Sequence, residues 1–133
     1  DTNGSHPEVI EEILSLGLCD YFAVDYKAPA ENYPSICGKG TDAGQVLKAI
    51  QLLSGSGVLF EVRTTVIPQL GREDLVMMAK ELPAVPRYVL NRYKVPDKYL
   101  PHDEERIRKR PYSRDEMQSL ADGITAWQPN ISV

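Results

Sequence analysis

Charged and polar side chains recur near the ends of three strand-like segments of this 133-residue chain. The segments are YFAVDYK, VLFEVRTTVI and PRYVLNRYK, and each follows a stretch with helical periodicity. The residues concerned are Asp25, Lys27, Arg63, Thr65, Asn91 and Tyr93. Strands of a helix-covered parallel sheet are nearly all apolar, and such sheets bind ligands at the carboxyl ends of their strands. The pattern therefore indicates a binding site at that edge.

Two strand faces are expected to bring opposite charges together. Alternation places Ala23, Asp25 and Lys27 on one face of the first strand, and Glu61, Arg63 and Thr65 on one face of the second. Buried charges must pair with one another or with a ligand, because an unpaired one is costly. An amino-acid-like ligand fits, since Asp25 could accept from its ammonium while Lys27 or Arg63 holds its carboxylate. A purely structural salt-bridge network is the alternative.

The elements around these residues alternate between helix and strand. Helices are expected over residues 7–16, from 41 or 42 to the SGSG turn at 54–57, over 73–82, and after the capping box of Ser113 and Glu116; strands are expected over 21–27, 58–67 and 87–93, with NISV as a short closing strand. Such alternation predicts right-handed crossovers and a parallel sheet. A complete eight-stranded barrel needs about 250 residues. We therefore expect an α/β fold with one domain over 1–133, a partial TIM-type barrel with an open curved sheet and outer helices.

Two helices carry apolar stripes at helical spacing. The first stripe is Val9, Ile10, Ile13 and Leu14; the last is Met117, Leu120 and Ile124, with Trp127 as a further candidate. The connection over residues 94–111 is long enough to indicate function or mobility. Its basic run RIRKR at 106–110 follows three acidic residues, which favours a solvated loop, with a contact to an acidic partner surface as the alternative.

Composition excludes several classes of protein. The net charge of −4 gives no electrostatic basis for binding nucleic acid, and no apolar run reaches the ~20 residues of a membrane span. Without a signal-peptide pattern, we expect the cytoplasm as its location. Cys19 and Cys37 fit no metal motif and are interpreted as reduced thiols, with a disulfide or redox pair as the alternative. His6 and His102 lack catalytic partners, so no catalytic residue is assigned.

The opening segment DTNG suggests a fragment or processed form, because it precedes a helix as the end of a strand would. Asp1 and Asp25 would then end adjacent strands, where two carboxylates repel unless a cation or proton separates them. Oxygen ligands of this kind suit a hard cation. An Asx-type turn leading into the helix explains DTNG equally well.

Taken in order, DTNG, YFAVDYKAP, FEVRTTVIP and RPYS resemble the C-terminal two thirds of the radical S-adenosylmethionine (SAM) activating enzymes. The likeness is to the anaerobic ribonucleoside-triphosphate reductase activating proteins, with the pyruvate formate-lyase activating enzyme as a related type. It implies the C-terminal half of a (β/α)6 barrel. It also implies an oxidoreductase that cleaves SAM reductively with a [4Fe–4S] cluster, takes electrons from a donor such as flavodoxin or ferredoxin, and forms a glycyl radical on a partner enzyme.

The same resemblance implies roles for individual residues. Asp25 and Lys27 would contact the amino-acid moiety of SAM, with Arg63 and Thr65 in the same pocket. Asn91 and Tyr93 would approach its adenosine part. Asp1, Thr2 and Asp25 would match a monovalent-cation site.

The chain departs from the family pattern in three places. It lacks CxxxCxxC and the GGE-type segment, both expected upstream of Asp1, so residues 1–133 alone are expected to be inactive. The segment VLNRY also replaces the apolar-Gln pattern of the reductase activators. Two other functions are compatible with the residues: a barrel lyase or aldolase with a Schiff base on Lys27, and a non-catalytic module that binds a partner through residues 94–111.

Overall fold

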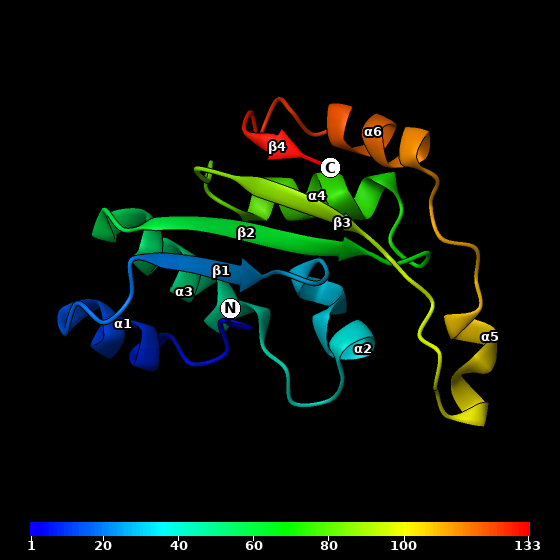
Figure 1. Cartoon of the computed structure of the whole chain (residues 1–133), viewed down its shortest axis with the longest axis horizontal. Helices are drawn as coiled ribbons and strands as arrows, with labels where there is room; N and C mark the ends of the chain where they lie inside the picture. The colour runs from blue at the N-terminus through cyan, green and yellow to red at the C-terminus, as the bar shows by residue number, and fades with distance from the viewer.

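The sheet has four parallel strands in the order β1-β2-β3-β4 (Figure 1). The computed structural model describes all 133 residues. The strands are β1 (Tyr21–Asp25), β2 (Leu59–Val66), β3 (Tyr88–Arg92) and β4 (Ile131–Ser132). They follow chain order from one edge to the other and do not close into a ring. The open parallel sheet of a partial barrel is thereby confirmed, and NISV does supply a closing strand.

The chain has six helices, most of which pack against one face of the sheet. They are α1 (Pro7–Ser15), α2 (Tyr33–Cys37), α3 (Ala43–Ser56), α4 (Arg72–Glu81), α5 (Glu104–Ile107) and α6 (Arg114–Asp122), with 3-10 turns η1 (Ala30–Asn32) and η2 (Pro101–Asp103). In Figure 1, α3 and α4 lie behind the sheet, and α1 lies beside α3. None of the helices has the length and apolar character needed to cross a membrane.

The core lies between the sheet and these helices. Val24, Val62 and Leu90 are almost wholly buried, and they meet buried residues such as Ile50 of α3 and Met78 of α4. Because side chains alternate along a strand, the residues on either side of Val24, Val62 and Leu90 point to the other, helix-free face. That face holds the charged residues expected at the site.

Helix boundaries follow from local chemistry. The Asp42 side chain accepts a hydrogen bond from the Gly44 backbone N–H at 2.8 Å and begins α3. The helix runs on through the first three residues of the SGSG turn and ends at Gly57, whose φ of +78° suits glycine. The end of the helix predicted at the SGSG turn is therefore slightly early, because serine and glycine tolerate a last helical turn.

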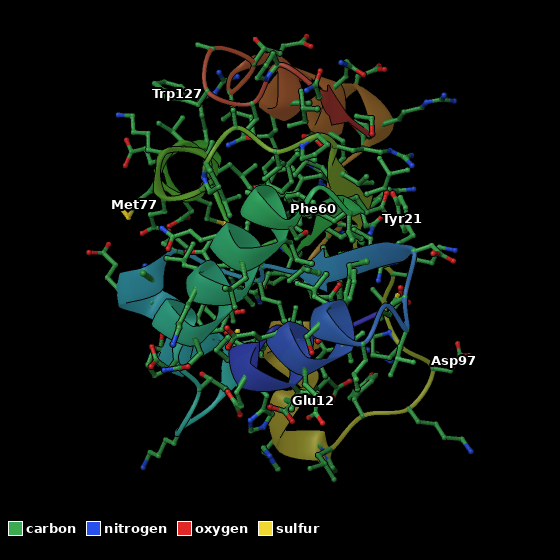
Figure 2. The ribbon with its side chains drawn as sticks, turned by 90° about the vertical axis from the view of Figure 1, so that its left-hand side faces the viewer. Glu12, Tyr21, Phe60, Met77, Asp97 and Trp127 are labelled. Carbon is green, nitrogen blue, oxygen red and sulfur yellow. The ribbon has the colours of Figure 1, made fainter.

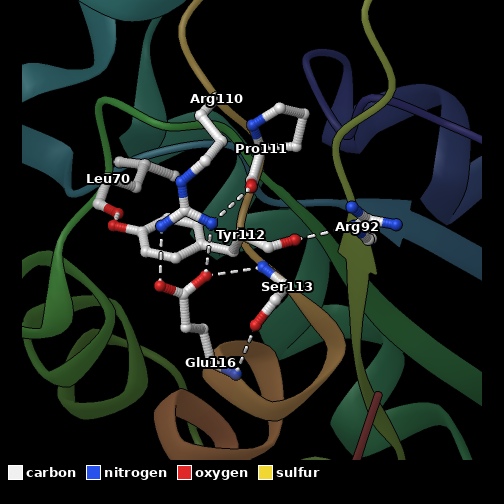
Figure 3. A network of polar contacts seen from close by, with 7 residues as sticks. All are labelled: Leu70, Arg92, Arg110, Pro111, Tyr112, Ser113 and Glu116. Carbon is white, nitrogen blue, oxygen red and sulfur yellow. Dashed lines mark hydrogen bonds and ion pairs between the residues drawn. The ribbon is translucent and has the colours of Figure 1, made fainter.

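Figure 3 shows how the start of α6 is fastened. The Ser113 hydroxyl accepts from the Glu116 N–H at 3.2 Å, and Glu116 accepts from the Ser113 N–H at 2.6 Å. Arg110 adds an ion pair to Glu116 at 2.7 Å. The Tyr112 hydroxyl donates to the Leu70 carbonyl at 2.8 Å and joins this region to the loop after β2. The predicted capping box is confirmed.

Two expected core residues are on the surface instead. Val9 is 48% exposed and Trp127 is 38% exposed; Figure 2 shows Trp127 at the periphery and Phe60 inside. Because α6 ends at Asp122, helical spacing does not extend to position 127. Gln128 is buried in its place, accepting from the Val85 N–H and donating to backbone carbonyls of the α4 end.

Other differences concern the segments that follow the strands. Residues 30–37, for which no element is expected, form η1 and α2, and the connection 94–111 contains η2 and α5. Strand β1 ends at Asp25, so Lys27 lies in a loop, and β3 ends before Tyr93. These short elements have too few residues for a periodic signal.

Gly4 brings the opening segment against the core. Thr2 forms a parallel bridge with Val24, and its backbone exchanges hydrogen bonds of 2.9 Å with Ala23 and Asp25. The chain then turns at Gly4, where φ is +68° and a Cβ would lie 3.0 Å from Val46 Cγ1. Only glycine meets both requirements without strain.

Gly4→Ala is expected to destabilise the protein more than Gly17→Ala. Both positions have positive φ, but nothing lies within 4 Å of a Cβ built at Gly17. The control should cost about 1 kcal/mol from the backbone alone, and Gly4→Ala an additional ~1–3 kcal/mol from the forced contact. Chemical denaturation measures both; equal losses would contradict this account.

Acid should loosen the start of α6. Hydrogen bonds from Arg110 and then from the Ser113 backbone lower the pKa of Glu116 from 4.5 to about 2. Because this pKa is lower in the folded state, ionised Glu116 stabilises the folded protein at pH values above 4.5. That contribution to stability is lost as pH falls from 4.5 through 2. Glu116→Gln should therefore flatten the fall in melting temperature across this window, less so at high salt. Glu104→Gln, which removes a surface partner of Arg108, should not flatten it.

Candidate functional site

Opposite charges meet where β1 and β2 end. Asp25 and Arg63 are register partners in the two parallel strands, so their side chains leave the sheet on the same side. Arg63 Nε lies 3.6 Å from Asp25 Oδ1, and Lys27 Nζ lies 3.8 Å from Asp25 Oδ2. The carboxylate and both cations therefore converge at the carboxyl edge; alternation predicts this for Asp25 and Arg63, whereas Lys27 reaches Asp25 from the loop after β1.

Asp1 joins this cluster from the neighbouring segment. Its Oδ1 lies 2.9 Å from Arg63 Nη2, so one guanidinium stands between two carboxylates. The Arg63 side chain is 24% exposed, and its buried Nε makes no hydrogen bond. The 3.6 Å separation from Asp25 gives attraction without a hydrogen bond, which leaves Nε with unused donor capacity.

The arrangement gives no support to the expected cation at Asp1, Thr2 and Asp25. Arg63 already separates the two carboxylates, which was the task assigned to the ion. The Thr2 hydroxyl accepts from the Gly4 N–H at 3.1 Å, and the structure contains no group of three metal-ligating side chains. The Asx-like turn is the interpretation that these contacts favour.

A cavity of about 680 Å³ opens beside the cluster. Asp25, Lys27, Arg63 and Thr65 line it, together with residues of α2 and of the start of α3. In Figure 1, α2 and α5 stand beyond the carboxyl ends of the strands, where this cavity lies. Its volume is within the range of small-molecule sites.

Asn91 and Tyr93 do not line this cavity. Asn91 is the register partner of Thr65 and is exposed. Tyr93 lines a smaller adjoining cavity of about 270 Å³ and donates to the Ile107 carbonyl at 3.2 Å. The two cavities share Ile67 and Arg106, so the third strand contributes to the site only through the smaller one.

A partly buried contact, which no local sequence pattern indicates, holds the α2 wall of the cavity. Glu81, at the end of α4, accepts from the Tyr26 hydroxyl at 2.5 Å and from the Ala30 N–H at 3.1 Å. Tyr26 stacks on Tyr33, which lines the cavity, at 5.7 Å between centroids. Burial, with a smaller contribution from Glu81, raises the pKa of Tyr26, and burial raises that of Tyr33 to about 12. Both phenols therefore stay neutral donors.

Glu61 belongs to a different network, although it shares a face with Arg63. It is buried at the opposite end of β2, where it accepts from the Tyr21 hydroxyl at 3.0 Å and pairs with Arg87 at 3.1 Å. Tyr21 and Arg87 both contact Oε2 of this carboxylate and neutralise it, and Glu61 does not line the large cavity. The structural salt-bridge interpretation holds at this end of the sheet.

The donor set of the large cavity fits the amino-acid end of a ligand. Asp25 offers carboxylate oxygens to an ammonium, while Lys27 and Arg63 offer cationic donors to a carboxylate. The buried Nε of Arg63 makes no hydrogen bond, so electrostatic attraction alone joins it to Asp25. Lys27 is exposed and off the strand, which argues against the desolvated lysine that a Schiff-base enzyme needs.

The residues present do not fit an iron–sulfur cluster. Cys19 and Cys37 are both free and line different cavities. With no third cysteine in the chain, they cannot provide a ligand set for such a cluster.

Comparison with known proteins agrees with this geometry. Residues 1–82, which include Asp25, Lys27 and Arg63, match the radical SAM superfamily. The chain is also similar to a protein of Methanocaldococcus jannaschii that bears the provisional name glycyl-radical enzyme activating enzyme. The two are 32% identical over 139 residues, which cover 100% of this chain and 56% of the relative.

The chain therefore spans a little over half the length of the relative it matches. The resemblance to activating enzymes that the four segments indicate is confirmed, while the reductase type remains a prediction. On the superfamily match and the relative together, the chain belongs to the radical SAM superfamily.

Proposed function

We propose that these residues form the C-terminal part of an activating enzyme that generates a glycyl radical on a partner enzyme, and that their part is to hold the amino-acid end of SAM. The observation that carries the proposal is the cavity at the carboxyl edge with Asp25, Lys27 and Arg63 in its wall. The superfamily match and the name of the relative support it. An anaerobic ribonucleotide reductase or a pyruvate formate-lyase type enzyme is the proposed partner.

In this proposal the chain binds and orients SAM. Asp25 accepts from the ammonium, and the cations of the cavity attract the carboxylate. Asp25 is set in place by Lys27 and Arg63, so the acceptor is oriented before the ligand arrives. Bound SAM, reduced by one electron from the cluster, would be cleaved to methionine and the 5′-deoxyadenosyl radical that takes hydrogen from the partner's glycine. Cluster ligands and the contact for flavodoxin or ferredoxin are assigned to parts of the protein outside residues 1–133.

The first test removes the acceptor. Asp25→Asn should weaken binding of SAM about tenfold or more, because a charge-assisted hydrogen bond contributes about 1.5–3 kcal/mol. Isothermal titration calorimetry under anaerobic conditions measures this. Asp20→Asn, at the opposite end of β1 and exposed, is the matched control and should bind normally. Unchanged affinity in Asp25→Asn would refute the proposed grip.

The second test concerns the cluster. Residues 1–133 alone, supplied with iron and sulfide, should retain no [4Fe–4S] cluster and release no 5′-deoxyadenosine from SAM, because they contain no group of three metal-ligating side chains. Iron analysis, electron paramagnetic resonance and product chromatography measure this. Release of 5′-deoxyadenosine by this chain by itself is the contrary result.

A further inference from the structure

Arg106 of α5 stands in the wall between the two cavities. It is the one residue of the connection 94–111 that lines the large cavity, and it also lines the smaller one. In Figure 1, α5 stands apart from the sheet, beyond the carboxyl end of β3. Arg106 therefore faces the same space as Arg63 but comes from a different part of the chain.

The charges of the cavity wall are unequally compensated. Arg63 is shared between Asp1 and Asp25, and Lys27 lies 3.8 Å from Asp25. None of the ion pairs includes Arg106. Its one side-chain hydrogen bond runs from Nη2 to the Ile36 carbonyl at 3.1 Å. A guanidinium has five N–H donors, so most of its capacity is open.

The backbone around Arg106 is held from two sides, although the residue itself is exposed. Its carbonyl accepts from Gln69 Nε2 at 2.9 Å, and the next carbonyl, that of Ile107, accepts from the Tyr93 hydroxyl. The field of Lys27 and that of Arg106 both oppose the rise that burial causes in the pKa of Cys37. Both cations therefore act on the same corner of the cavity. Because its backbone is fixed in advance, Arg106 loses less freedom on binding an anion than an arginine on a free loop would.

We propose that Arg106 receives the carboxylate of the ligand, with Lys27 beside it, and that Arg63 is a positioning residue that orients Asp25 for the ammonium. This rests on the proposed function, because it takes the amino-acid end of SAM as the ligand. The reason is electrostatic: Arg63 already has two carboxylates, whereas Arg106 has none. A planar guanidinium with open donors is the group best suited to a carboxylate.

The experiment compares two ligands on the full-length protein. S-adenosylhomocysteine carries the amino-acid end, and 5′-methylthioadenosine lacks it. Arg106→Gln removes the charge and keeps a polar amide on the side chain. Arg108→Gln is the matched control, because Arg108 is on the same segment, pairs with Glu104 and Tyr99, and lines neither cavity. Titration calorimetry gives affinities, and thermal melts check folding.

Arg106→Gln should weaken S-adenosylhomocysteine about tenfold or more and leave 5′-methylthioadenosine unchanged. Arg108→Gln should change neither. The inference is overturned if Arg106→Gln has no effect on S-adenosylhomocysteine, or if it weakens both ligands equally, which would mark a structural role. Failure of the unaltered protein to bind S-adenosylhomocysteine would overturn the proposed function and this inference together.

Discussion

The site depends on the pairing of Asp25 with Arg63 across two parallel strands. The register of β1 and β2 sets the two backbones side by side, and pleating sends both side chains to the helix-free face. Half-burial makes each charge costly alone, so each is stable only beside the other. The pair is nevertheless imperfect, because Arg63 Nε has no hydrogen bond. An ion pair without a hydrogen bond can rearrange more easily than a bonded one, which suits a site that must admit a ligand.

The two ends of the same sheet face serve different purposes. At the amino end, Glu61 is buried and pairs with Tyr21 and Arg87 in a structural contact. At the carboxyl end, Asp25 and Arg63 border a cavity. The difference comes from the connections: helices and turns that follow the strands enclose the large cavity at the carboxyl edge. This is the arrangement in which α/β folds carry ligand sites.

The wall of that cavity is supported from the core. Glu81 joins the end of α4 to Tyr26 and to the start of η1, and Tyr26 stacks under Tyr33. Both phenols stay neutral, since burial raises the pKa of each. Hydrogen bonds from a hydroxyl and a backbone N–H to one carboxylate are directional, so they fix the position of this wall relative to Arg63.

The sequence alone determined the parallel sheet, the main helices, the capping box at Ser113 and the convergence of Asp25 with Arg63, because period and alternation are local properties of the chain. Other features depended on tertiary contacts. Glu81 holds the start of residues 30–37 through the Ala30 N–H, and Gln128 replaces Trp127 in the core. Arg106 reaches the cavity from a segment interpreted as a solvated loop. Each involves partners 40 or more positions away in the chain, and no local pattern encodes such a contact. The tertiary structure likewise determines which cations have no carboxylate partner, because the partners come from distant segments.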